Sequence, residues 1–336
     1  MKPPPILVTG GTGFLGRRLV ERLLRDGGRV RVLVRSRPRA AGLAERGAEI
    51  VVGDITDRAR VSAAVESATM VYHVAGRLLV PGVSAEEYQR THVEGTRVVL
   101  SACQHAPSVP RFIHVSTTGV LGATGDHPAA EDAPLRPTNI YEATKARAEL
   151  MVCESWLDGF PAVIGRPGLV YGPGDLHLLP FFHSVLRRRF RPIGGAPVRL
   201  HPIYIDDLID ALILCGRHPS AVGECFHLAG RTPLSLAELA RTIAQAGGTR
   251  MPTGYIPISA ARAVALVGDR LPGALRRSAP LTTSRLDFLT HSRVYDTSKA
   301  ARVLGFTATT DIAPGVGQTV AWYCREGYLP TLAAAA

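Results

Sequence analysis

Short apolar runs and amphipathic segments alternate along the first half of the chain. Runs rich in Val and Ile are typical of strands that are buried on both faces. The segments between them repeat apolar residues at helical spacing, which predicts helices that bury one face. This alternation predicts an α/β fold with a doubly wound parallel sheet. The expected strands are residues 6–8, 30–34, 49–52, 70–74, 111–115 and 162–164, and the expected helices include 15–25, 85–103 and 140–156.

The pattern changes after about residue 168. Proline and glycine crowd residues 173–197, and we expect a short hairpin around residues 192–200. An apolar helix follows at 208–215, and helices dominate from residue 234 to about residue 327. We therefore expect a smaller, mostly helical C-terminal lobe beside the sheet. The expected boundaries are 1–168 together with 202–218 for the sheet domain, 169–201 and 219–330 for the lobe, and 331–336 for a frayed tail.

The composition is that of a folded protein. Apolar residues make up 46% of the 336 residues and charged residues 20%, which argues against a disordered chain. No apolar run approaches the roughly 18 residues of a membrane span, and the first residues lack the hydrophobic core of a secretory signal. The five cysteines are scattered without metal-ligand spacing, which argues against a metal site and against a disulfide framework. We expect a cytoplasmic protein.

The chain is strongly basic, with a formal net charge of +11 from 39 Lys and Arg against 28 Asp and Glu. Nearly all of these cations are arginines, and they are dense only at residues 35–39 and 187–191. No nucleic-acid recognition motif accompanies the charge, and aromatic residues make up only 6% of the chain. We expect no nucleic-acid partner.

A glycine-rich turn lies between the first expected strand and the first expected helix. Its glycines follow the pattern G-x-x-G-x-x-G, which allows a tight turn and lets the backbone approach a pyrophosphate at the helix N-terminus. The same glycines would also suit an ordinary tight turn, but the position after the first strand favours a dinucleotide site. The expected cofactor contacts in this turn are Gly10, Thr12, Gly13, Phe14, Leu15 and Gly16.

The end of the second strand bears on the choice of dinucleotide. NAD-preferring sites usually carry an acid there, whereas this chain reads Val34-Arg35-Ser36-Arg37. Arg35 can pair with a 2′-phosphate, and a contact of roughly 1.5–3 kcal/mol would favour NADP(H) about 10- to 150-fold. The alternative is an ordinary solvated arginine, and NAD(H) stays the second choice. Further expected contacts are Asp54 and Ile55 after the third strand, and Ala75 and Gly76 after the fourth.

Tyr141 and Lys145 are the candidate groups for proton transfer. Residues at i and i+4 share one face of a helix. A phenol with its ordinary pKa near ~10 is a poor acid–base catalyst at neutral pH. A nearby ammonium, together with the positive ring of an oxidised nicotinamide, is expected to favour the phenolate. Thr117 lies 24 residues before Tyr141 in the run Ser116-Thr117-Thr118. A hydroxyl there can hydrogen-bond a substrate oxygen.

With these motifs the chain resembles the extended short-chain dehydrogenase/reductase family, also called the NAD(P)-dependent epimerase/dehydratase group. The resemblance covers nearly the whole chain and implies a Rossmann-type fold. It also implies catalysis by Thr117, Tyr141 and Lys145, with Ser116 the less favoured hydroxyl. Pro167 and Gly168 would flank the nicotinamide, with Leu169 next to them in the cofactor site. The motifs are TGGTGFLG at 9–16, GD at 53–54, STTGVLG at 116–122, RPGLVYGPG at 166–174 and YIDDLIDAL at 204–212.

His92 departs from the pattern of this family. Relatives usually carry Asn in an N-V-x-G-T segment, and this chain reads His92-Val93-Glu94-Gly95-Thr96. His92 shares a helical face with Tyr88 and Gly95, so we expect it to point inward. We favour a core histidine with satisfied hydrogen bonds over a proton relay or a substrate contact. The other substrate candidates are Ser116, Thr118 and Tyr171.

The second half of the chain distinguishes between branches of the family. Nucleotide-sugar epimerases commonly carry an Asn where this chain has Leu169, although the arginines at 187–191 could partly substitute for that polar contact. The stretches 279–282 and 295–300 resemble instead the branch of 3β-hydroxysteroid dehydrogenases and 2-alkyl-3-oxoalkanoate reductases, with dihydroflavonol-reductase-like enzymes close by. Residues 258–275 are mostly small and apolar. They could line an apolar substrate pocket, rest on a membrane surface or pack against their own domain.

These features predict an NADP(H)-dependent oxidoreductase that interconverts a ketone and a secondary alcohol on a bulky hydrophobic small molecule. The alternatives are a nucleotide-sugar epimerase or dehydratase and a non-enzymatic dinucleotide sensor. A sensor would not need the Tyr141/Lys145 pair. The resemblance also implies a homodimer through the helices at 85–103 and 140–156.

Overall fold

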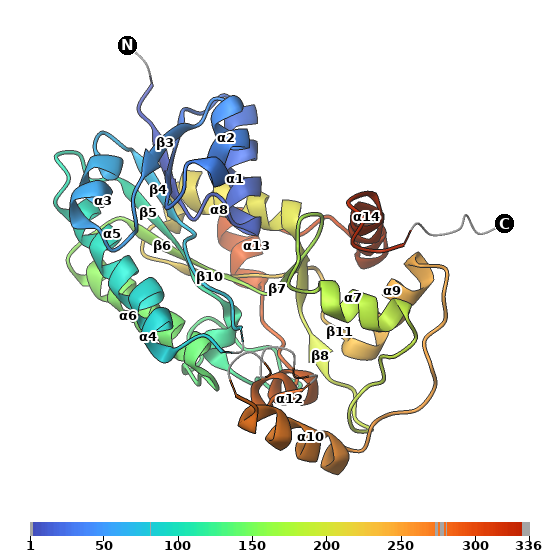
Figure 1. Cartoon of the computed structure of the whole chain (residues 1–336). Helices are drawn as coiled ribbons and strands as arrows, with labels where there is room; N and C mark the ends of the chain where they lie inside the picture. Colours follow the sequence, from blue (N-terminus) through green and yellow to red (C-terminus); the bar gives the residue numbers. More distant parts are fainter. Residues whose placement is uncertain (1–2, 81, 273–274, 276–278, 280, 331–336) are drawn as a thin grey trace.

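The computed structural model describes residues 3–80, 82–272, 275, 279 and 281–330 of the chain. The expected tail at 331–336 lies outside the described residues. Seven strands form one parallel sheet, in the order β10-β6-β5-β4-β1-β2-β3 (Figure 1). Its strands are β1 (Ile6–Thr9), β2 (Val30–Val34), β3 (Glu49–Val52), β4 (Met70–His73), β5 (Arg111–Val115), β6 (Ala162–Pro167) and β10 (Cys225–Leu228). The predicted doubly wound sheet is therefore confirmed.

Strand β10 corrects the expected domain boundary. Residues 219–330 were expected in the lobe, yet Cys225–Leu228 pairs with β6 and completes the sheet. The strand is only four residues long and follows a proline-bearing 3₁₀ turn, so its apolar pattern is too short to separate it from the lobe by sequence. All four residues are buried, because the sheet supplies the hydrogen-bonding partners that so short a strand lacks alone.

Alternate residues of each strand supply two different cores. Val8, Val32 and Ile113 face helices α1 (Phe14–Arg25) and α8 (Ile205–Arg217). Their neighbours Leu7, Leu33 and Phe112 face helices α3, α5 and α6 on the other side. This period of two explains why the strands are apolar throughout. The remaining helices of the sheet domain are α2 (Ala41–Glu45), α3 (Arg58–Val65), α4 (Ala85–Tyr88), α5 (Gly95–Gln104) and α6 (Ile140–Leu157), with 3₁₀ turns η1 (Pro38–Ala40), η3 (Thr118–Leu121) and η4 (Pro219–Ala221).

The helix expected over 85–103 is interrupted. Between α4 and α5 the chain forms a π-helical turn, η2 (Gln89–Glu94), which contains His92. Gly95 follows this turn directly, and a Cβ atom there would lie 2.4 Å from Ile55 Cδ1. Ile55 therefore packs directly against the helix backbone, and a side chain at position 95 would have to displace it. The wider turn changes the helical phase at His92, which the sequence pattern did not reveal.

The lobe is built from short strand pairs and helices. The hairpin expected at 192–200 does not form. Instead β8 (Arg199–Leu200) pairs with β11 (Leu234–Ser235), and Ile193 bridges to Ile256. The chain prefers these distant partners because they cover the lobe's own small cores. The other elements are β7 (Leu169–Tyr171), its parallel partner β9 (Pro202–Tyr204), α7 (Leu179–Leu186), α9 (Leu236–Ala246), α10 (Ile258–Arg270), α12 (Thr283–Thr290), α13 (Ser298–Leu304) and α14 (Ile312–Arg325).

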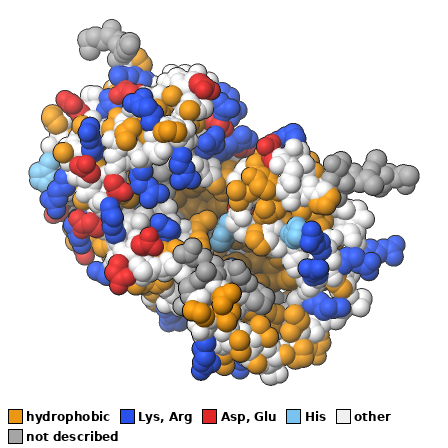
Figure 2. All heavy atoms as spheres, viewed as in Figure 1, with side chains coloured by type: hydrophobic (Ala, Val, Ile, Leu, Met, Phe, Trp, Pro, Cys, Tyr) orange, Lys and Arg blue, Asp and Glu red, His pale blue; other side chains and the backbone are white. Residues whose placement is uncertain are grey.

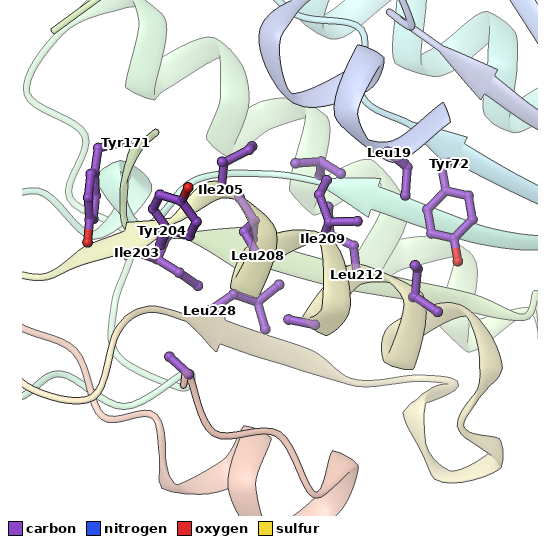
Figure 3. Close-up of a cluster of buried hydrophobic side chains, with 14 of the residues drawn as sticks. Leu19, Tyr72, Tyr171, Ile203, Tyr204, Ile205, Leu208, Ile209, Leu212 and Leu228 are labelled. Atoms are coloured by element: carbon purple, nitrogen blue, oxygen red, sulfur yellow. The ribbon is translucent and has the colours of Figure 1, made fainter. Parts of the chain in front are cut away.

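A continuous apolar core joins the lobe to the sheet. Figure 3 shows this core running along α8, from Tyr72 at the sheet to Tyr171 and Tyr204 at the lobe. The rings of Tyr171 and Tyr204 meet edge to face, with centroids 5.6 Å apart. A Cβ atom at Gly315 of α14 would lie 2.5 Å from the Tyr171 hydroxyl. Tyr171, a substrate candidate from the sequence, thus packs between elements in the core.

Candidate active site

The C-terminal ends of the central strands carry most of the predicted site residues. Parallel strands present these ends at one edge of a sheet, and open α/β sheets bind ligands there. β1 leads into the glycine turn, β4 into Ala75 and Gly76, β5 into Thr117, and β6 ends at Pro167. Figure 2 shows a hollow lined largely by hydrophobic side chains between the sheet domain and the lobe.

The glycine turn has the geometry of a pyrophosphate cradle. Gly10 has φ +74°, and a Cβ atom there would lie 2.7 Å from the backbone of Ala75. A Cβ atom at Gly16 would lie 2.2 Å from the Gly10 carbonyl oxygen, so the turn is closed against its own helix. Helix α1 starts at Phe14 without a side-chain cap and without an acid in its first turn. The positive helix end is therefore available to an anion, and the turn fits a dinucleotide pyrophosphate.

Arg35 and Asp54 lie near one another beyond β2 and β3. Arg35 is exposed and follows the last residue of β2. Partial burial disfavours the charge of Asp54, but hydrogen bonds from Thr56 and the cations Arg90 and Arg35 outweigh it and lower its pKa. The Asp54 Oδ1 atom accepts from the Thr56 backbone nitrogen at 3.0 Å and from its hydroxyl at 2.7 Å. Asp54 thus stays ionised next to an arginine that no acid of β2 neutralises.

Tyr141 and Thr117 lie together at the end of β5. Asn139 caps α6 by accepting from the Glu142 backbone nitrogen at 3.0 Å, which places Tyr141 in the first turn. Thr117 Oγ1 accepts from the Gly119 backbone nitrogen at 3.0 Å, and its own O–H is turned toward Tyr141. Burial raises the pKa of Tyr141 to about 12, and a hydrogen bond with Thr117 opposes this rise.

Lowering of this pKa by Lys145 together with an oxidised nicotinamide stays a prediction. Lys145 is buried, and its Nζ donates to the Val115 carbonyl oxygen at 2.6 Å, on the last residue of β5. Burial lowers the pKa of this ammonium to about 8, against the attraction of the Glu149 carboxylate. The ammonium is therefore held at the strand end. In this structure the phenol is more strongly affected by the loss of water than by the cation.

His92 is bound on both sides by the protein. The Arg77 backbone nitrogen donates to its Nε2 at 3.0 Å, so Nδ1 carries the hydrogen and donates to Thr144 Oγ1 at 2.8 Å. Thr144 in turn donates to the Ile140 carbonyl oxygen at 2.8 Å, in the first turn of α6. Burial and the charge of Lys145 lower the pKa of His92 to about 3, so it is neutral. No ring nitrogen of His92 is left for a substrate, as the favoured interpretation expected.

The hydroxyls on either side of Thr117 are also engaged within the protein. Ser116 donates to Glu149 Oε2 at 2.5 Å, and Thr118 donates to the Pro167 carbonyl oxygen at 3.0 Å. Thr117 is thus the residue of this run whose hydroxyl faces Tyr141. The two bonds tie the run to α6 on one side and to the end of β6 on the other.

A buried ion pair that the sequence analysis missed supports this arrangement. Glu149 and Arg166 pair at 2.5 Å, with side-chain exposures of 1% and 6%. Arg166 also donates to the Glu131 carbonyl oxygen at 2.9 Å. Two signals could have revealed the pair: Glu149 is one helical turn beyond Lys145, and Arg166 lies in a strand that is otherwise apolar.

A second buried group links the site to the lobe. Arg293 pairs with Glu142 of α6 at 3.4 Å and with Asp287 of α12 at 2.7 Å. Glu142 also accepts from the Thr138 backbone nitrogen at 2.7 Å. The first turn of α6, which carries Tyr141, is therefore fastened to α12. Glu142 and Arg293 are more than 100 residues apart in the sequence, so no local sequence pattern indicates this pair.

The dinucleotide side of the site has its own fixed polar group. His73, at the end of β4, lies 2.8 Å from Thr9 Oγ1 and 3.0 Å from Thr96 Oγ1. The Ala75 backbone nitrogen donates to the same Thr9 oxygen at 3.3 Å. Burial lowers the pKa of His73 to about 3. This neutral histidine ties β1, β4 and α5 together behind Ala75 and Gly76.

Two comparisons with known sequences point to one family. The model of the NAD dependent epimerase/dehydratase family matches residues 6–229. A ketoreductase of Stigmatella aurantiaca, which acts on a 4-hydroxy-2-methyl-3-oxo-4-farnesyl-3,4-dihydroquinoline-1-oxide, is 31% identical over 89% of this chain and 90% of its own. A 3 beta-hydroxysteroid dehydrogenase/Delta 5-->4-isomerase of Mycobacterium tuberculosis is 33% identical over 90% of this chain and 85% of its own. A 2-alkyl-3-oxoalkanoate reductase of Shewanella oneidensis is 28% identical over 92% and 84%.

Solved structures share the fold over nearly the whole chain. The crystal structure of gox2253 matches with a TM-score of 0.78 and 28% identity, over 98% of this chain and all of that one. A UDP-glucuronic acid 4-epimerase from Bacillus cereus, solved with its substrate and NAD, matches with a TM-score of 0.76 over 96% and 99%. At 22% identity the second likeness concerns the fold alone.

Proposed function

Because the chain belongs to the NAD-dependent epimerase/dehydratase family, and is thus an NAD(P)-dependent enzyme, we propose that it interconverts a ketone and a secondary alcohol on a bulky hydrophobic substrate. The observation that carries this proposal is the pairing of the Tyr141 and Thr117 hydroxyls at the end of β5, with Lys145 one helical turn away. The sheet domain would hold the dinucleotide and the lobe the substrate.

In the proposed reduction, Tyr141 gives its proton to the carbonyl oxygen of the substrate. A phenol with a pKa of about 12 is protonated at neutral pH, which suits this direction. Thr117 donates a hydrogen bond to the same oxygen, because a carbonyl oxygen can only accept one. Lys145 keeps a positive charge close to the charge that develops on that oxygen. When bound, the dinucleotide supplies the hydride.

The preference for NADP(H) over NAD(H) is part of this proposal. Arg35 is exposed at the end of β2 and no acid of that strand competes with a phosphate. We expect Arg35→Ser to raise KM for NADPH about 10- to 150-fold and to leave KM for NADH nearly unchanged. Arg39→Ser, a nearby arginine inside the 3₁₀ turn η1, is the matched control. Equal effects on both cofactors would contradict a 2′-phosphate contact.

Hydrophobic ketones are the substrate class that the similar proteins and the residues favour. The relatives with farnesyl-quinoline and steroid names act on large apolar molecules. Leu169 stands where nucleotide-sugar epimerases commonly have an amide, and it is half-buried beside apolar residues of the shared core. A polar diphosphate would lose a hydrogen bond at that position.

The test is a substrate screen in which the absorbance of NADPH is the measured quantity. Steroid, 2-alkyl-3-oxoacyl and flavonoid ketones are offered with NADPH and with NADH, and UDP-sugars are offered with catalytic NAD. The proposal expects NADPH consumption with at least one hydrophobic ketone. Formation of an epimeric sugar without net change of the dinucleotide would replace it with the epimerase alternative.

We also propose a homodimer and a cytoplasmic location. The outward face of α6 exposes Leu150 and Leu157, which supports a partner helix there. Leu150→Glu is expected to convert a dimer to a monomer in sedimentation velocity. Among the described residues, no helix is long and apolar enough to cross a membrane.

A further inference from the structure

Helix α10 carries an apolar surface on two adjoining faces. One face, with Ala261 and Ala265, packs against Ile193, Leu281 and Leu286 in a small core of the lobe. The adjoining face exposes Val264 and Val267, at 46% and 63%. An amphipathic surface helix would place polar residues there. The exposed face of α10 therefore lacks a partner within the described part of the chain.

This exposure is concentrated rather than scattered. Of the sixteen large hydrophobic side chains that are exposed among the described residues, seven lie between residues 255 and 275. A groove of about 310 Å³ continues the exposed face. Figure 2 shows hydrophobic side chains gathered at this tip of the lobe, below the hollow. The groove is lined by Ala263, Val264, Val267, Gly268 and Leu271.

The charges of the described residues around this tip are mostly positive. Residues 250–272 contain three arginines, Arg250, Arg262 and Arg270, and one acid, Asp269. Arg262 and Arg270 are exposed on α10, and Arg191 reaches the loop before the helix by donating to the Thr253 carbonyl oxygen at 3.3 Å. Apolar side chains surrounded by arginines match the interface of an anionic bilayer, where phosphate charge lies directly above hydrocarbon.

The tip also lies next to the proposed catalytic site. Helix α10 packs on α12 through Ala265 and Leu286. Asp287 of α12 accepts from the Thr138 hydroxyl at 3.2 Å, just before the helix that carries Tyr141. A hydrophobic substrate that leaves a membrane at α10 would therefore have a short path to the hollow between lobe and sheet.

We propose that residues 255–270, with α10 at their centre, dock the enzyme on anionic membrane surfaces and admit a membrane-dissolved substrate. This inference rests on the proposed function for the nature of the substrate. A second copy of the chain would cover the apolar face equally well. The arginines argue against that occupant, because two like-charged faces would meet and repel.

The test is sedimentation of the full chain with phosphatidylcholine vesicles, with and without about 30% phosphatidylserine. We expect binding to the anionic vesicles and release by high salt. The double variant V264S/V267S should bind at least about ten-fold more weakly. The matched control V109S/V222S changes two exposed valines in the loops before β5 and β10, at the opposite edge of the sheet, and should bind like the unmodified protein.

The outcomes separate this inference from the proposed function. Turnover of a small water-soluble ketone by V264S/V267S should equal that of the unmodified protein, while turnover of a vesicle-dissolved ketone should fall with binding. Equal vesicle binding by both double variants would overturn the membrane surface. If the unmodified protein were a dimer that binds no vesicles, and V264S/V267S were a monomer, the exposed face of α10 would be assigned to a second copy of the chain. Vesicle binding without turnover of any ketone would instead contradict the proposed function.

Discussion

The α6 side of the hollow and the α10 tip differ in which side chains are buried and which are exposed. Around α6 the chain buries charges, with Glu149 and Arg166 nearly inaccessible, and each is held by its neighbours. At α10 it exposes valine and leucine side chains to solvent. Buried charge is costly unless it is paired, and exposed apolar surface is unfavourable unless it is covered. The first region is thus complete within the chain, whereas the second is completed by something outside it.

The strongest test of the completed region is removal of the Tyr141 hydroxyl. Tyr141→Phe is expected to lower kcat about 10²- to 10⁴-fold, because the proton donor is lost while the ring and its packing remain. Kd for NADPH, measured by fluorescence, should stay nearly unchanged. The control is Tyr88→Phe, which removes a buried hydroxyl elsewhere. The Tyr88 hydroxyl accepts from the Val80 backbone nitrogen and donates to the Leu78 carbonyl oxygen. Comparable kcat values for the two variants would contradict the assignment.

Breaking the buried ion pair should weaken the fold as a whole. Arg166→Met leaves the Glu149 carboxylate buried without its main partner, which is expected to cost about 3–5 kcal/mol. The measurement is the urea dependence of unfolding. The double variant E149Q/R166M removes the stranded charge and should recover part of the loss. If the single and double variants were equally unstable, lost packing and not the unpaired charge would be the cause.

The pH dependence of reduction should report the burial of Lys145. A lysine is charged below its pKa, and burial has lowered this pKa to about 8 from its ordinary 10.5. Reduction should therefore be fastest below pH 8 and decline as the pH rises through 8, where the cation loses its proton. Lys145→Arg keeps its charge throughout this range, so its lower activity should not show that decline. A decline of the same size in the arginine variant would assign it to another group.

The smallest effect is expected at the tip. Val267→Ser should change the free energy of unfolding by less than about 0.5 kcal/mol, because its side chain is already 63% exposed. Val316→Ser, on the buried face of α14, should cost several times more in the same measurement. A large loss at Val267 would mean that this side chain is covered within the chain and would remove the contrast between the two regions.

Much of the sheet domain could be predicted from the sequence because its signals are local. The apolar runs located six of the seven strands, and the glycine turn was predicted at the start of α1. Tyr141 and Lys145 were placed on one helix by their spacing. The failures have a common cause. Strand β10, the pairing of β8 with β11 and the π-helical turn at His92 depend on partners far along the chain.

The order of apolar and polar residues by itself determined the parallel sheet, the glycine-rich turn before α1 and the position of Tyr141 and Lys145 on one helix, because each needs only neighbours within a few residues. Tertiary structure alone decided which polar groups are held in place. It brought Ser116 to Glu149, Glu142 to Arg293 and His92 to Thr144, and it shielded the half-buried Tyr141 from water, which raises the pKa of its phenol. Burial and long-range pairing are properties of the packed molecule, since they arise only when segments distant in the chain exclude water together.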